Sequence, residues 1–121
     1  MATNFVSDGD SLPYTNTTGA AIASGQVIAI GHILAIALVA IPVGAIGQVA
    51  TEGVFTVPKV PGAVFVQGEK LLWDASALAF DDSAATPSAG DILGGAIAWF
   101  AGADGQATAT IKLTPGNAAK T

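Results

Sequence analysis

Cysteine and arginine are both missing from this 121-residue chain, and each absence excludes a class of site. Without cysteine the chain can form neither a disulfide framework nor a thiolate metal site. A single histidine, His32, nearly excludes zinc as well, because zinc sites draw several ligands from histidine and cysteine. The sequence therefore predicts no metal and no other cofactor.

Charged residues are scarce, at 11% of the chain, and nine acids against four bases give a net charge of -5. The bases are lysines spread singly along the chain, at Lys59, Lys70, Lys112 and Lys120. Binding to nucleic-acid phosphates takes clustered lysine and arginine, so we expect no nucleic-acid partner. Because 51% of the residues are hydrophobic, so few charges also leave apolar surface to be covered, which favours self-association.

The longest apolar stretch, residues 27–46, is too short and too interrupted to predict a membrane span. Its continuous part, from Ile33 to Ile46, falls short of the about 20 residues that a spanning helix needs, and no cationic flank follows it. The first residues also lack the basic and apolar regions of a signal peptide. We therefore expect a soluble protein with no membrane partner.

Short blocks of strand-forming residues separated by turn signals predict an all-β fold. Residues 44–58 read as a strand, a kink at Gly53, a second strand and a stop at Pro58, which cannot donate to a ladder. Further strands are expected at 26–30, 33–39, 69–74, 77–80, 92–100 and 107–113, with short candidate strands at 20–23 and 64–66. A helix at 33–41 is the alternative there, because leucine and alanine favour it. About seven to nine short strands predict a small β-barrel or sandwich.

Three glycine-containing signals predict specific local geometry. Gly31-His32 separates two apolar runs and would place His32 at the tip of a hairpin. The double glycine Gly94-Gly95 indicates a bulge or a close backbone approach. Asp104-Gly105 fits the positive-φ positions of a hairpin turn.

We expect three parts along the chain. Residues 1–19, interrupted by turn-forming clusters, would form an extended N-terminal arm with apolar anchors at Phe5 and Tyr14. Residues 20–114 would form a single β domain, and residues 115–121 a flexible tail. For the arm, an edge strand that completes the protein's own sheet remains the alternative.

No arrangement of residues predicts catalysis. His32 lies in the most apolar region, which favours a core or hairpin histidine over a general base. The adjacent pair Asp81-Asp82 fits a solvated turn, and Asp8-Gly9-Asp10 lacks the acidic ligands that complete a calcium loop. Between Gly62 and Lys70 the spacing differs from that of a phosphate-binding loop. We therefore expect the protein not to be an enzyme.

Several blocks together resemble a family of small tailed-phage proteins, and the resemblance runs nearly end to end. The blocks are Asn4-Phe5-Val6, Gly25-Gln26-Val27, Val49-Ala50-Thr51-Glu52-Gly53-Val54-Phe55 followed by Pro58-Lys59, Gly68-Glu69-Lys70 with Trp73-Asp74, Gly94 to Ile97, and Ala107 to Leu113. The family, formerly a domain of unknown function and sometimes labelled a phage recombinase, is similar to capsid decoration (cement) proteins. The recombinase label implies nucleotide and DNA binding, for which the residues are missing.

The resemblance implies a structural virion protein on the outside of the icosahedral head. Such proteins sit there as oligomers, commonly trimers, which implies the major capsid protein as partner and stabilisation of the head as function. Before assembly the protein would be soluble in the host cytoplasm. We expect Phe5, Val6 and Tyr14 to contact the capsid or a neighbouring subunit.

A β-rich binding module, such as a carbohydrate-binding virion protein, is the alternative function. It would use Trp73, Trp99 or Phe100 as an exposed stacking platform. The apolar neighbours of these aromatic residues predict that they are buried instead, which disfavours this alternative.

Overall fold

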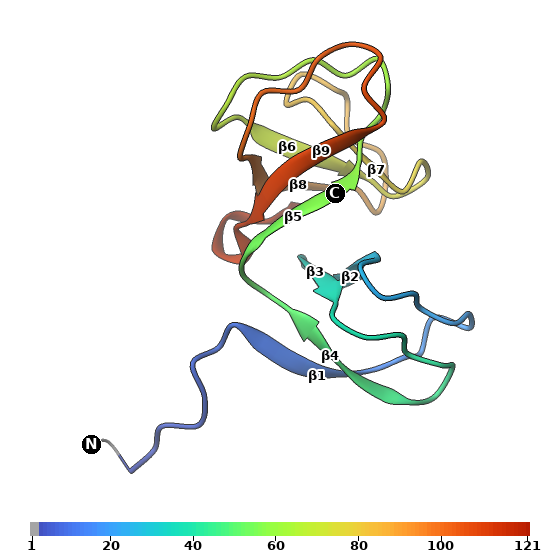
Figure 1. Ribbon diagram of the computed structural model, residues 1–121, viewed down its shortest axis with the longest axis vertical. Helices are drawn as coiled ribbons and strands as arrows, with labels where there is room; N and C mark the ends of the chain where they lie inside the picture. The colour runs from blue at the N-terminus through green and yellow to red at the C-terminus, as the bar shows by residue number, and fades with distance from the viewer. Residues whose placement is uncertain (1–2) are drawn as a thin grey trace.

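The computed structural model describes residues 3–121, which fold into two antiparallel β-sheets (Figure 1). The first sheet, in the order β1-β4-β3-β2, contains β1 (Ser11–Thr15), β2 (Val27–Ile30), β3 (Ile33–Ala37) and β4 (Ile46–Ala50). The second sheet, in the order β5-β9-β8-β6-β7, contains β5 (Val54–Pro58), β6 (Lys70–Asp74), β7 (Ala79–Asp81), β8 (Ile92–Ala98) and β9 (Thr108–Leu113). The 3-10 helix η1 (Pro115–Asn117) and β10 (Ala119–Lys120), which pairs with β8, complete it. The described residues contain no α-helix, so the predicted all-β fold is confirmed.

The second sheet curls into a partly closed barrel. Lys59, directly after β5, forms a parallel bridge with Phe80 in β7, so the two outer strands of the sheet approach each other. The Val60 N–H donates to the Phe80 carbonyl at 2.9 Å and fastens this contact. The ring of Phe80 is fully buried beside that of Trp73, with 5.0 Å between the ring centres. Closure of this kind hides the strand edges that an open sheet would expose.

Strand β3 lies between two hydrophobic clusters and is buried on both faces. Leu34 and Ile36 point into the main cluster, which fills the barrel and the space between the two sheets. Ala35 and Ala37 point into a smaller cluster on the other face of the first sheet. A strand covered on both sides needs no polar alternation, which explains the continuous apolar sequence. The alternative of a helix at 33–41 is wrong.

The glycine signals at 31–32 and 94–95 are confirmed. Ile30 pairs with Ile33, which leaves Gly31, at φ 56°, and the exposed His32 as the hairpin turn. Between β6 and β8 the register shifts where Gly94-Gly95 lies, as a bulge requires. A Cβ on Gly94 would stand 2.5 Å from the carbonyl oxygen of Asn117, so the backbone there approaches too closely for a side chain.

Some expected strands are shorter or absent. Residues 20–23 and 64–66 contribute only single bridges, Ile22 to Ile41 and Phe65 to Gly102. Asp104-Gly105 does turn the chain, but it lies within a nine-residue connection between β8 and β9, residues 99–107. Long connections at this end leave more chain on the surface than a tight hairpin would.

The structure corrects the expected limits of the arm and the tail. Residues 11–15 are not free chain but form β1, an edge strand paired with β4, as the alternative held. Pro13 lies within β1, where an edge strand tolerates proline. At the other end, β10 pairs with β8 and the Thr121 N–H donates to the Asp91 carbonyl at 2.9 Å, so residues 119–121 are bonded to the body. Met1 and Ala2 lie outside the described residues.

Candidate binding surfaces

Several acidic side chains of the described residues accept hydrogen bonds from loop backbone. Asp91 is buried, and its carboxylate accepts from the Ala75 N–H at 3.0 Å and the Ser88 N–H at 2.9 Å. Among residues 3–121, no group of three or more metal-ligating side chains comes together. Glu52 is exposed at the kink between β4 and β5. The described residues offer three candidate surfaces that could bind a partner.

Hydrogen bonds lower the pKa of two carboxyls, those of Glu69 and Asp74. At Glu69 the largest cause is the Ser83 N–H, which donates to Oε2 at 3.0 Å, and the Val66 N–H adds a bond to Oε1 at 3.2 Å. At Asp74 the Ser76 hydroxyl, which donates to Oδ1 at 2.8 Å, is the largest cause of the lowered pKa. Both carboxylates thus stabilise turns in their ionised form.

The first candidate surface is the N-terminal arm, here defined as residues 3–8. Figure 1 shows it extending away from the body of the molecule. Phe5 is 61% exposed and Val6 93% exposed. The root of the arm is fixed by buried Thr51, whose N–H donates to the Asp10 carbonyl at 3.0 Å and whose hydroxyl donates to the Gly9 carbonyl at 2.8 Å. The arm thus presents apolar side chains from a fixed starting point.

Tyr14 does not accompany Phe5 and Val6. It lies in β1 and packs, half-buried, against the smaller hydrophobic cluster. Leu12, two residues earlier on the same face of the strand, packs against the same cluster. Of the three expected contact residues, Phe5 and Val6 are therefore exposed on the arm, whereas Tyr14 anchors β1, the strand that follows the arm.

The second candidate surface is an apolar tip patch, defined as Val64, Val66, Trp99 and Phe100. Trp99 is 42% exposed and Phe100 58% exposed, so the expectation that they are buried is wrong, whereas Trp73 is buried as expected. The bridge between Phe65 and Gly102 turns the side chains flanking Phe65 outward, because neighbours along an extended segment point to opposite faces. The loops that carry the patch lie at the end of the barrel farthest from the arm (Figure 1).

A buried lysine holds the loops next to this tip patch. The Lys59 ammonium donates to three backbone carbonyls, those of Val60 at 2.8 Å, Pro61 at 3.0 Å and Gln106 at 3.2 Å. The side chain is only 2% exposed, and its three donors match the three acceptors. This role was not predicted from the sequence. The sequence signal that could have predicted its burial is the two-residue spacing from Val57, because residues two apart in a strand face the same side and Val57 is buried.

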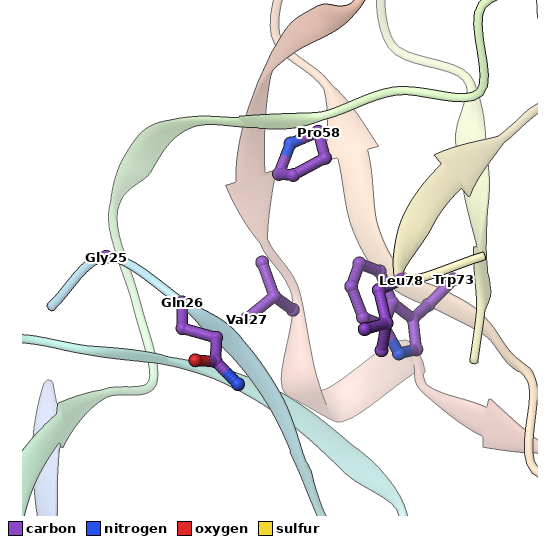
Figure 2. Close-up of a pocket in the computed structure, with 6 residues that line it drawn as sticks. All are labelled: Gly25, Gln26, Val27, Pro58, Trp73 and Leu78. Atoms are coloured by element: carbon purple, nitrogen blue, oxygen red, sulfur yellow. The ribbon is translucent and has the colours of Figure 1, made fainter. Parts of the chain in front are cut away.

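The third candidate surface is an apolar pocket where the two sheets meet. It has a volume of about 190 Å³ and is lined by Gly25, Gln26, Val27, Pro58, Trp73 and Leu78. Figure 2 shows the side chains of Val27, Pro58 and Leu78 around one space, with Trp73 behind Leu78. Pockets for drug-sized ligands are larger, about 300–1,000 Å³. This pocket therefore suits a single apolar side chain.

Comparison with known proteins points to one structural family. The family model for phage cement proteins matches residues 6–113, which includes every strand from β1 to β9. A search of curated proteins gave no match. In the part of the chain that the structure describes, no helix is long and apolar enough to cross a membrane. The chain belongs to the phage cement protein family, and its role is accordingly structural and associated with the capsid.

Proposed function

We propose that the protein binds the outside of the icosahedral phage head as an oligomer, with a trimer favoured, and stabilises the head. Its partner there is the major capsid protein, and before assembly it is soluble in the host cytoplasm. Membership of the phage cement protein family supports a capsid-associated role. That family is a structural one, which supports a structural role without catalysis.

The tip patch is the observation that carries this proposal beyond family membership. Its exposed aromatic side chains are the types that dominate the energy of protein interfaces. The loops beneath them are fixed before binding: the Gln67 side chain donates to the Trp99 carbonyl at 3.1 Å, and Lys59 joins the loop after β5 to the loop before β9. A surface fixed in advance loses little conformational entropy when it docks. We assign the tip patch to contact with the capsid protein.

Multiple copies would make a modest contact sufficient. Once one subunit of an oligomer is bound, the others meet the shell at a high effective concentration, so the overall affinity exceeds that of one site. This requires that the surfaces for self-association and for the capsid be separate. The arm and the tip patch satisfy this requirement, because the arm and the loops that carry the patch lie at opposite ends of the longest axis of the molecule (Figure 1).

Co-sedimentation with heads that lack the protein tests this assignment. We expect the double variant Trp99→Ser, Phe100→Ser to bind heads at least about tenfold more weakly, because aromatic anchors are lost. Val43→Ser, which changes a side chain of similar exposure far from the tip patch, is the matched control and should bind as the wild type does. Undiminished binding of the double variant would refute the tip patch as the capsid contact, and failure of the wild type to bind would refute the function.

A further inference from the structure

The first sheet has one edge that is open to strand addition. In the sheet order, β1 and β2 are the outer strands. The Asp10 carbonyl bonds to the Thr51 N–H, so by antiparallel alternation Pro13 faces the free edge of β1, where its missing N–H interrupts any further ladder. On β2 the Ala37 N–H bonds to the Gln26 carbonyl. The same alternation therefore turns the backbone groups of buried Val27 and exposed Ala29 away from β3, and no proline blocks this edge.

The apolar pocket lies beside this open edge. Gly25, Gln26 and Val27 form one of its walls, while Pro58, Trp73 and Leu78 form the other (Figure 2). Leu78 is held there at φ 53°, a left-handed conformation that is unusual for leucine. An edge that gives backbone hydrogen bonds, next to a pocket that accepts a side chain, is the arrangement by which domains bind extended peptides.

The arm has the properties of the segment that this site would bind. Residues 3–8 contain no proline, are exposed throughout and carry Phe5 as their one aromatic side chain. An extended arm of this length reaches about 20 Å. It starts at the β1 edge, on the opposite side of the first sheet from β2, and points away from β2 (Figure 1). An arm that reached the pocket at the β2 edge would therefore come from another copy.

We propose that the arm of one copy adds as a strand to the free edge of β2 in a second copy, with the Phe5 ring in the pocket over Trp73. The contact joins two different surfaces, arm and pocket, and such a head-to-tail contact forms a ring, as a trimer requires, when the rotation between copies is one third of a turn. It rests on the oligomer of the proposed function and names the interface that forms it. Charge also fits, because the arm region carries Asp8 and Asp10, while Lys120 lies near the end of β2 and donates to the Gly31 carbonyl at 3.4 Å.

Two complementary variants test the interface by the light-scattering mass of the full chain. Deletion of residues 3–8 removes the donor arm, and Ala29→Pro removes an outward N–H from the acceptor edge without breaking the ladder to β3. We expect each variant alone to be a monomer, and the mixture to form a dimer of about twice 11.9 kDa, because one supplies the arm and the other the pocket. Val6→Ser should keep the wild-type mass, since neighbouring residues of a strand face opposite sides.

A peptide titration covers the case in which Ala29→Pro does not fold. A peptide of residues 3–10 is added to the chain that lacks residues 3–8 and carries Trp99→Phe, so that Trp73 alone reports by fluorescence. We expect saturable binding, weakened at least about tenfold by Phe5→Ala in the peptide. A monomeric wild type, a mixture of folded variants that stays monomeric, or equal responses to both peptides would overturn the interface. Head binding is measured separately: an oligomer that survives deletion of residues 3–8 and still co-sediments with heads refutes this inference alone, whereas a monomeric wild type also refutes the oligomer of the proposed function.

Discussion

At the scale of single residues, Lys59 shows how a charge can be buried without a carboxylate. Its ammonium is satisfied by three carbonyls from two loops, so removing it leaves those acceptors without their partner. We expect Lys59→Met to lower the free energy of unfolding by about 1–3 kcal/mol, the range for buried groups left unsatisfied. Urea denaturation measures the change. Lys112→Met, at an exposed position of β9, is the control, and equal stability of the two variants would contradict the role of Lys59.

Glu69 gives the protein a dependence on pH that can be assigned to one loop. Its pKa is lowered in the folded protein, so the ionised form contributes stability above the ordinary value of 4.5, and this contribution is lost as the pH falls through the lowered pKa. Glu69→Gln should therefore show a smaller loss of stability on acidification than the wild type. The measurement is the urea midpoint between about pH 6 and about pH 3. Glu52→Gln, at an exposed acid, should keep the wild-type profile.

At the scale of elements, the bulge in β8 depends on glycine. Gly94 has φ 79°, and any Cβ there would meet the Asn117 carbonyl of the η1 segment. We expect Gly94→Ala to destabilise the fold by about 1–3 kcal/mol, the cost of a strained backbone position. Gly116→Ala is the matched control, because its Cβ would meet nothing within 4 Å. Thermal denaturation compares the midpoints of the two variants. Equal midpoints would show that the bulge tolerates a side chain at Gly94.

The sequence predicted those elements whose local signals agree with their environment. The alternation in β9, the turn at Gly31-His32 and the double glycine of β8 are all readable because each local pattern has one structural meaning. Trp99 and Phe100 were wrongly predicted to be buried, because an apolar run does not reveal at which residue a strand leaves the core. The pocket and the open edge of β2 could not be predicted, since they arise from the meeting of two sheets whose relative placement no local pattern encodes.

At the scale of the whole molecule, exposed apolar surface and low charge make association part of stability. The large hydrophobic side chains of the arm and the tip patch are among those exposed in the single chain. A contact made only between folded copies stabilises them by mass action. We therefore expect the thermal midpoint of the wild type to rise with protein concentration, and its light-scattering mass to approach three times 11.9 kDa.

The chain lacking residues 3–8 separates this effect from intrinsic stability. The deletion leaves the bonds of Thr51 to Gly9 and Asp10 in place, and β1 stays paired with β4, so the fold of a single chain should be unchanged. Its thermal midpoint should equal that of the dilute wild type and should not change with concentration. Calorimetry over about a hundredfold range of concentration makes the comparison, because each tenfold change in the concentration of a binding partner alters the linked free energy by about 1.4 kcal/mol. A wild-type midpoint independent of concentration would mean that the arm does not couple association to folding.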